Sequence, residues 1–149
     1  MNTRRLKCLR EELKKANIDA MLVRSGANLR YISGYSGSNG LSYITMDDAW
    51  FFTDFRYKEQ SRQEVNNMHI VVPETADLFK SLKECRCVKA GMKVGFEGNR
   101  LSFEDYSALP VLFPDTEFVS KPMLLEKLAS VKEQVELDAL QEAARVSDA

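Results

Sequence analysis

The residues of this 149-residue chain that could do chemistry gather in one stretch, from position 34 to position 57. The stretch begins with Gly34, Gly37 and Gly40 at intervals of three and ends in Asp54-Phe55-Arg56-Tyr57. A carboxylate, a guanidinium and a phenol this close together could form an ion pair, cap a helix or bind an anion. Glycine-rich loops also bind phosphates, so we consider that chemistry first.

The glycine spacing does not fit either common phosphate-binding motif. A dinucleotide-binding loop has the pattern G-x-G-x-x-G between a strand and a helix, whereas the first two glycines here are three apart. A P-loop has Gly-Lys-Ser/Thr, whereas Gly40 precedes Leu41. The residues after Gly40 predict a strand, which offers no helix N-terminus for a phosphate. We interpret the loop as a tight turn, or alternatively as one that lines a cleft or touches a neighbouring subunit.

Asp54, Arg56 and Tyr57 are the candidate site residues. Asp54 is predicted to cap a helix over residues 56–65, where Arg56 in the first turn would oppose the helix dipole by roughly 0.3–1 kcal/mol. In one interpretation Arg56 only pairs with Asp54 or another carboxylate. In the other, its guanidinium faces a substrate carboxylate or the cleft of a neighbouring subunit, which its fork of donors suits. Tyr57 is interpreted as packing first and as part of a site second.

The remaining reactive residues predict no metal site. Cys8, Cys85 and Cys87 are an odd number, which argues against a disulfide framework, and Cys85-Arg-Cys87 is too closely spaced for a zinc knuckle. His69 is the single histidine and adjoins an apolar run, which places it at the edge of a strand rather than on a metal.

Composition excludes other classes of function. Lys and Arg number 21 against 22 for Asp and Glu, a net charge of -1, so no basic surface predicts nucleic-acid binding. No apolar stretch approaches the roughly 20 residues of a membrane span. The charged N-terminus lacks the apolar core of a signal peptide. We therefore expect a cytoplasmic protein that binds neither nucleic acid nor membrane.

Hydrophobic periodicity predicts an α/β fold with a mixed, roughly six-stranded sheet and helices on its faces. The predicted strands are 20–23, 41–45, 49–53, 69–72, 93–97 and 116–119, and the predicted helices after the first are 56–65, 78–85 and 103–109. The first helix is predicted from a cap at Asn2 or Thr3 to an end at Asn17, with a stripe of Leu6, Leu9, Leu13 and Ala16. The second and third strands flank a short polar turn and form a hairpin, which makes the sheet mixed rather than parallel. Alternation places Trp50 and Phe52 on one sheet face and Phe51 on the other.

The composition changes after Pro122, because no glycine, proline or aromatic residue follows Met123. Two helices are predicted, over 124–128 and 133–149, and Leu137, Leu140 and Ala144 lie on one face of the second. Since this helix has no glycine or proline stop, we expect the chain to continue in a longer polypeptide. Residues 1–122 are predicted to form one domain, and 123–149 the linker helices that follow it.

Several motifs, in order and spacing, resemble the N-terminal domain of the Xaa-Pro peptidases, which are aminopeptidase P and prolidase, with creatinase as a relative. The motifs are Asn28-Leu29-Arg30-Tyr31, Gly34-Tyr35-Ser36-Gly37-Ser38-Asn39-Gly40, Phe52-Thr53-Asp54-Phe55-Arg56-Tyr57, Val94-Gly95-Phe96-Glu97-Gly98, and Lys132 with Glu136 and Ala143-Ala144. The resemblance covers nearly the whole chain.

The resemblance implies a two-domain subunit. A pita-bread catalytic domain would follow and carry two divalent metals, probably manganese, on two aspartates, a histidine and two glutamates, all beyond Ala149. It implies a homodimeric metallopeptidase that cleaves short Xaa-Pro peptides. This chain would be the non-catalytic N-terminal domain, inactive alone, with Asp54, Arg56 and Tyr57 near substrate or a neighbouring subunit's cleft. The residues do not decide between dipeptidase and aminopeptidase.

Two other functions stay open on the sequence alone. Some relatives keep the whole fold, lack the metals and bind peptides or proteins, so this chain could belong to a metal-free binding module. It could also be a free-standing small-molecule domain of flavodoxin-like shape, although the uncapped C-terminal helix argues against that.

Overall fold

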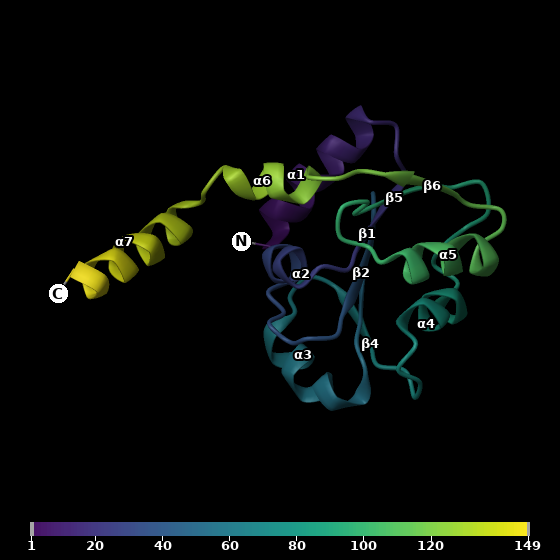
Figure 1. Cartoon of the computed structure of the whole chain (residues 1–149), viewed down its shortest axis with the longest axis horizontal. Helices are drawn as coiled ribbons and strands as arrows, with labels where there is room; N and C mark the ends of the chain where they lie inside the picture. Colours follow the sequence, from purple (N-terminus) through teal and green to yellow (C-terminus); the bar gives the residue numbers. More distant parts are fainter. Residues whose placement is uncertain (1, 149) are drawn as a thin grey trace.

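One six-stranded sheet organises the chain in this computed structural model, which describes residues 2–148 (Figure 1). Its order is β4-β3-β2-β1-β5-β6. The strands are β1 (Ala20–Val23), β2 (Leu41–Thr45), β3 (Ala49–Phe52), β4 (His69–Val71), β5 (Lys93–Phe96) and β6 (Glu117–Ser120). β2 is antiparallel to β1 and β3, whereas β1–β5, β5–β6 and β3–β4 are parallel pairs. The predicted mixed, six-stranded α/β fold is confirmed.

Helices cover both faces of the sheet. The helices are α1 (Asn2–Lys15), α2 (Gly26–Ser33), α3 (Lys58–Glu64), α4 (Leu78–Cys85), α5 (Phe103–Leu112), α6 (Leu124–Ser130) and α7 (Gln134–Asp148), with a 3₁₀ turn η1 (Phe55–Tyr57) before α3. One core cluster joins α1, α2 and α6 to the sheet, and the other joins α4 and α5. In Figure 1, α4 and α5 accordingly lie on the opposite side of the sheet from α1 and α2.

Successive side chains of a strand point to opposite faces of the sheet, so each face packs into one of the two core clusters. Phe51 packs with the α1 and α2 side, and Phe52 and Trp50 pack with the α4 and α5 side. The central strand β1 alternates in the same way, with Met21 on the first side and Leu22 on the second. The predicted facing of the three aromatic residues in β3 is therefore confirmed.

Helix α1 forms where its leucine stripe predicts it. Leu6, Leu9 and Leu13 are buried, and burial of each such side chain contributes roughly 1.5–3 kcal/mol. Asn17 ends the segment with φ of 56°, the left-handed conformation that asparagine tolerates. Leu125 of α6 is buried in the same core, which fixes α6 to the body of the domain.

The sequence patterns missed helix α2 and misplaced several boundaries by a few residues, as at the end of α5, which continues to Leu112. α2 is only eight residues long, and Leu29 and Ile32 are too few to establish a helical period. The predicted helix over 56–65 divides into η1 and α3, because Tyr57 adopts φ of -107° and ψ of 13° between them. Arg56 therefore lies in a 3₁₀ turn rather than in an α-helix.

The glycine loop is a structural turn packed against an aromatic ring of its own domain. Gly34 ends α2 in the left-handed conformation, with φ of 87°. A Cβ at Gly37 would lie 2.2 Å from Tyr35 Oη. The Tyr35 ring is buried and its hydroxyl is hydrogen-bonded, so it cannot move aside. The interpretation as a tight turn is confirmed, and cleft or subunit contact stays a prediction.

Helix α7 differs from the other α-helices because none of its described residues is buried. It extends away from the body of the domain in Figure 1. The predicted apolar positions Leu137 and Leu140 are exposed. Within residues 2–148, no helix is both long enough and apolar enough to cross a membrane. The domain boundary after Pro122 stays a prediction.

We predict that Gly37→Ala lowers the free energy of unfolding by about 1–3 kcal/mol, the usual cost of overpacking. The added methyl group would overlap the fixed Tyr35 side chain. Gly26→Ala is the matched control, because no atom lies within 4 Å of its Cβ position and alanine favours a helix by up to about 1 kcal/mol. Denaturant unfolding measures both; equal stabilities for the two variants would contradict the packing argument.

Candidate functional site

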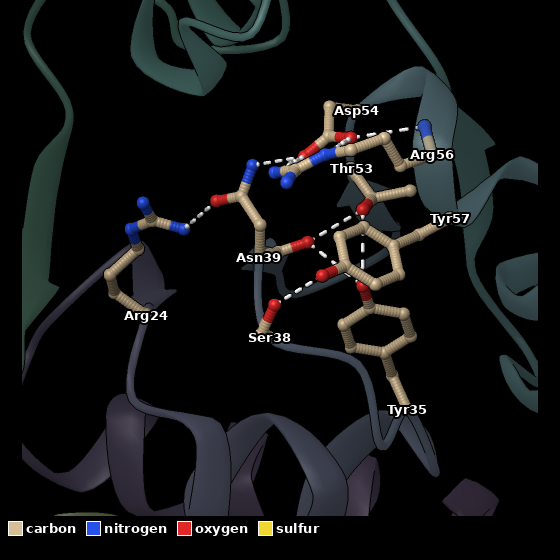
Figure 2. Close-up of polar contacts among 8 residues, drawn as sticks. All are labelled: Arg24, Tyr35, Ser38, Asn39, Thr53, Asp54, Arg56 and Tyr57. Carbon is tan, nitrogen blue, oxygen red and sulfur yellow. Dashed lines mark hydrogen bonds and ion pairs between the residues drawn. The ribbon is translucent and has the colours of Figure 1, made fainter.

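The candidate site lies at one edge of the sheet, where several strands end together. β1, β3 and β5 run in the same direction, so the residues after Val23, Phe52 and Phe96 meet at this edge. β2 runs the opposite way, so the loop over 34–40 enters the sheet there. The topology thus brings the predicted glycine loop beside the Asp54 segment (Figure 2).

Asp54 is the centre of the polar contacts at this edge. Its side chain is 7% exposed, and Oδ1 accepts a hydrogen bond from the backbone N–H of Arg56 at 3.0 Å. Asp54 therefore acts as a cap, as predicted, but it caps η1, and α3 begins after Tyr57 without a side-chain cap bond. Asn39 Nδ2 donates to Oδ2 at 2.5 Å. Hydrogen bonds from the Arg56 side chain, and then from Asn39, lower the pKa of the Asp54 carboxyl to about 2. The carboxylate is therefore charged at neutral pH.

Arg56 is held by Asp54 and still faces solvent. Its Nε donates to Oδ1 at 2.9 Å and its Nη2 to Oδ2 at 3.1 Å, a bidentate pair. The Arg56 side chain is nevertheless 71% exposed, and its guanidinium carbon lies 5.3 Å from the centre of the Tyr57 ring. The pairing with Asp54 is thus present. Contact with a substrate or neighbouring subunit stays a prediction for all three candidate residues, Asp54, Arg56 and Tyr57.

Asn39 and Arg24 belong to the same cluster, and the sequence interpretation did not single out either. Arg24 Nη1 donates to Asn39 Oδ1 at 2.9 Å and to the Gly40 carbonyl at 2.7 Å. Figure 2 shows Asn39 between the Arg24 guanidinium and the Asp54–Arg56 pair. An amide suits this place, because its oxygen accepts from one arginine while its nitrogen donates to the aspartate. Only the fold brings Arg24 to the loop.

Hydroxyl groups fix the backbone of the loop on the other side of Asn39. Tyr35 Oη donates to the Asn39 carbonyl at 2.9 Å, and Thr53 Oγ1 donates to the same oxygen at 2.5 Å. Tyr57 Oη is hydrogen-bonded to Ser38 Oγ, and its ring meets Tyr35 edge to face at 6.1 Å. Tyr57 thus packs on the loop, the first of the two roles considered for it.

Glu64 fastens the start of the loop from α3. Its carboxylate accepts from the Ser36 backbone N–H at 2.8 Å and from Ser36 Oγ at 2.7 Å. The first of these bonds lowers the pKa of Glu64. With Asn39 held at the other end, the loop is bonded to the domain on both sides and is organised in advance of any ligand.

Glu97 occupies the N-terminus of α2, where a bound anion would otherwise be stabilised. Its carboxylate accepts from the backbone N–H groups of Arg24 at 2.7 Å and Ser25 at 2.9 Å. It also accepts from Ser25 Oγ and from Asn28 Nδ2. Because Glu97 is buried, a residue 72 positions from Ser25 caps the helix from inside the domain. This arrangement weighs against a phosphate at α2, and so against the small-molecule alternative.

The remaining reactive residues lie apart from this edge cluster. His69 is exposed on the edge strand β4, as predicted, with Nε2 3.3 Å from Asp48 Oδ1. Cys8, Cys85 and Cys87 are free thiols, and burial raises the pKa of Cys87 to about 12. Across residues 2–148, no three His, Cys, Asp or Glu side chains are grouped to hold a metal ion.

The fold of this chain belongs to a known class. The model of the Creatinase/Prolidase N-terminal domain family matches residues 5–131, so this chain belongs to that family. The domain is the N-terminal part of Xaa-Pro peptidases, and the resemblance seen in the sequence motifs is confirmed.

Three relatives show how similar this chain is to individual proteins. An uncharacterized peptidase, YqhT, from Bacillus subtilis is 35% identical over 97% of this chain and 40% of its own. An Xaa-Pro dipeptidase from Bacillus anthracis superposes with a TM-score of 0.86 at 32% identity, over 99% of this chain and 41% of its own. This chain thus spans about two fifths of their length. It matches 99% of the isolated N-terminal domain of cytoplasmic peptidase PepQ from Mycobacterium tuberculosis, with TM-score 0.72 and 30% identity over 86% of this chain.

We predict that Asn39→Asp raises the pKa of Asp54 above its value of about 2, because a donor is replaced by a second carboxylate. A ¹³C NMR titration of the aspartate carboxyl groups measures this shift. Asn99→Asp is the control, since Asn99 is exposed and contacts Met123. A pKa unchanged by Asn39→Asp would contradict the role of the amide.

The same shift predicts how stability depends on pH. The folded pKa of Asp54 is depressed, so its stabilising contribution is present above the unfolded pKa of about 3.9 and is lost as the pH falls towards about 2. In Asn39→Asp the folded pKa of Asp54 lies closer to the unfolded value, so the contribution above pH 3.9 should be smaller and its loss should be complete at a higher pH, as acid-unfolding curves of the two proteins would show.

Proposed function

We propose that this chain is the non-catalytic N-terminal domain of a metal-dependent Xaa-Pro dipeptidase or aminopeptidase, where it restricts and orients short proline-containing peptides. The observation that carries this role is the exposed Arg56 guanidinium, oriented by the buried Asp54 carboxylate at the edge of the sheet. An arginine in a fixed orientation is organised in advance to bind a peptide carboxylate.

A contact between Arg56 and the C-terminal carboxylate of the peptide would select short substrates. A peptide of two or three residues carries its C-terminal carboxylate close to the bond before proline, whereas a long chain does not. Arg56 donates through Nε and Nη2 to Asp54, and its Nη1 makes no hydrogen bond within the described part of the chain. That nitrogen would meet the carboxylate, and the neighbouring Tyr57 ring would flank it.

The metals of the proposed enzyme would be held outside this chain. Two divalent ions, with manganese expected, would generate a hydroxide and polarise the carbonyl before proline. Residues 2–148 contain no group of three potential ligands, so they do not fit a dinuclear centre. The residues described here would therefore contribute binding and orientation, and the hydrolytic step would belong to a catalytic domain.

Further partners follow from the same proposal. The exposed Leu137 and Leu140 on α7 support packing against the proposed catalytic domain, because an apolar stripe on a helix normally packs against another element. We infer a homodimer, in which this domain would lie near the cleft of the neighbouring subunit. We also infer a cytoplasmic location, supported by the PepQ relative, which is described as a cytoplasmic peptidase.

We predict that the purified 149-residue chain with manganese releases no proline from Xaa-Pro dipeptides or longer Xaa-Pro peptides above the blank. The reason is the missing set of metal ligands among its described residues. Amino-acid analysis of the reaction measures release. Turnover that persists after repeated purification would contradict the assignment of the chemistry to another domain.

We predict that Arg56→Ala in the longer protein lowers kcat/KM for an Xaa-Pro dipeptide roughly 10- to 150-fold and leaves the metal content unchanged. This range corresponds to the loss of one hydrogen bond to a charged group, about 1.5–3 kcal/mol. Arg62→Ala is the control, because Arg62 is also exposed and pairs with Glu59 within α3. If Arg56→Ala left the kinetics unaltered, the proposed substrate contact would be wrong and pairing with Asp54 would be the only role left for Arg56. A longer protein that binds such peptides without metal or cleavage would instead support a metal-free binding module.

A further inference from the structure

Arg5 of α1 is a buried cation far along the sequence from its partners. Its side chain is 6% exposed, with Nη2 3.1 Å from Glu133 Oε2 and 3.2 Å from Glu136 Oε1. Nη1 donates to the Tyr31 carbonyl at 2.7 Å, and the guanidinium carbon lies 4.2 Å from the centre of the Tyr31 ring. One side chain thus joins α1, α2 and the first turn of α7.

These ion pairs are the polar connection between α7 and the rest of the domain. The other side-chain bonds of α7, such as those of Gln134 and Arg145, are made within the helix itself. None of its described residues is buried. Hollows of about 340 and 450 Å³ border Arg5 on the α6 and α2 sides, so apolar packing does not replace the ion pairs there.

The segment before α7 has the features of a hinge. α6, whose Leu125 is buried in the core, ends at Ser130, and α7 begins at Gln134. The residues between them form no helix or strand. Rotation of the backbone over 131–133 would therefore swing α7 without disturbing the core, unless another contact holds it.

We propose that Arg5, through Glu133 and Glu136, locks the direction in which α7 leaves the domain. Arg5 is a suitable lock because the Tyr31 carbonyl and ring already orient its guanidinium before the glutamates bind. The family model ends at position 131, so both glutamates lie just outside the matched region. The lock would set where any domain after α7 lies, and it does not depend on Arg56 or on the proposed peptidase role.

The glutamine variants test the lock while keeping the helix intact. The Glu133 backbone N–H donates to Glu136 Oε2 at 2.9 Å, half of a capping box, and glutamine can keep that bond while losing the charge. We therefore compare Glu133→Gln/Glu136→Gln with the unchanged chain. Glu142→Gln is the matched control, because Glu142 also pairs with an arginine, Arg145, but within α7.

Backbone ¹⁵N relaxation measures whether α7 moves together with the rest of the domain. In the unchanged chain and in Glu142→Gln, the amides of α7 should tumble with those of the sheet. In Glu133→Gln/Glu136→Gln, and in Arg5→Leu, they should show a clearly shorter correlation time while β1 and β2 are unaffected and helix content is retained.

Three results would overturn the proposal. One is α7 tumbling independently in the unchanged chain, and another is α7 relaxation that is the same in the double variant as in the control. The third is a change in amide relaxation that is equally large in α7 and in the sheet, which would mean that the ion pairs stabilise the core instead of holding α7. If Arg5→Leu does not fold, the glutamine pair alone decides, because neither glutamate is buried.

Discussion

The hydrogen bonds accepted by the buried Asp54 carboxylate determine how the edge of the sheet is built. A charged carboxylate out of contact with water is costly unless donors satisfy it, and here two side chains and one backbone N–H do so. Those bonds cap η1, orient Arg56 and fasten Asn39. Asn39 in turn accepts a hydrogen bond from Arg24. The contacts that start at Asp54 thus join three segments of the chain.

The same physical device recurs elsewhere in the domain. Glu97 caps α2 from the end of β5, and Glu64 bonds the backbone of the glycine loop from α3. In each case an acidic side chain reaches a backbone N–H from a different element. These contacts make the edge rigid where short loops would otherwise move. Arg5 shows the converse arrangement: its buried cation pairs with two carboxylates, Glu136 in the first turn of α7 and Glu133 just before that helix.

An edge that presents one exposed guanidinium, held by a buried carboxylate, is suited to binding an anionic group. Residues 2–148 hold no cluster of three potential metal ligands. In our proposals the domain supplies orientation, both of Arg56 at the sheet edge and of α7 near the C-terminal end of the chain. This division agrees with a family in which the domain forms about two fifths of its longer relatives.

The sequence by itself determined the class of fold, the strands, the cap by Asp54 and the family. These features depend on local patterns, namely alternation, leucine spacing and motifs within a few residues of one another. The tertiary structure alone decided the short helix α2, the cap by Glu97 and the link from Arg24 to Asn39. Such contacts join residues far apart in the chain, and they depend on strand order and direction, which local patterns do not encode.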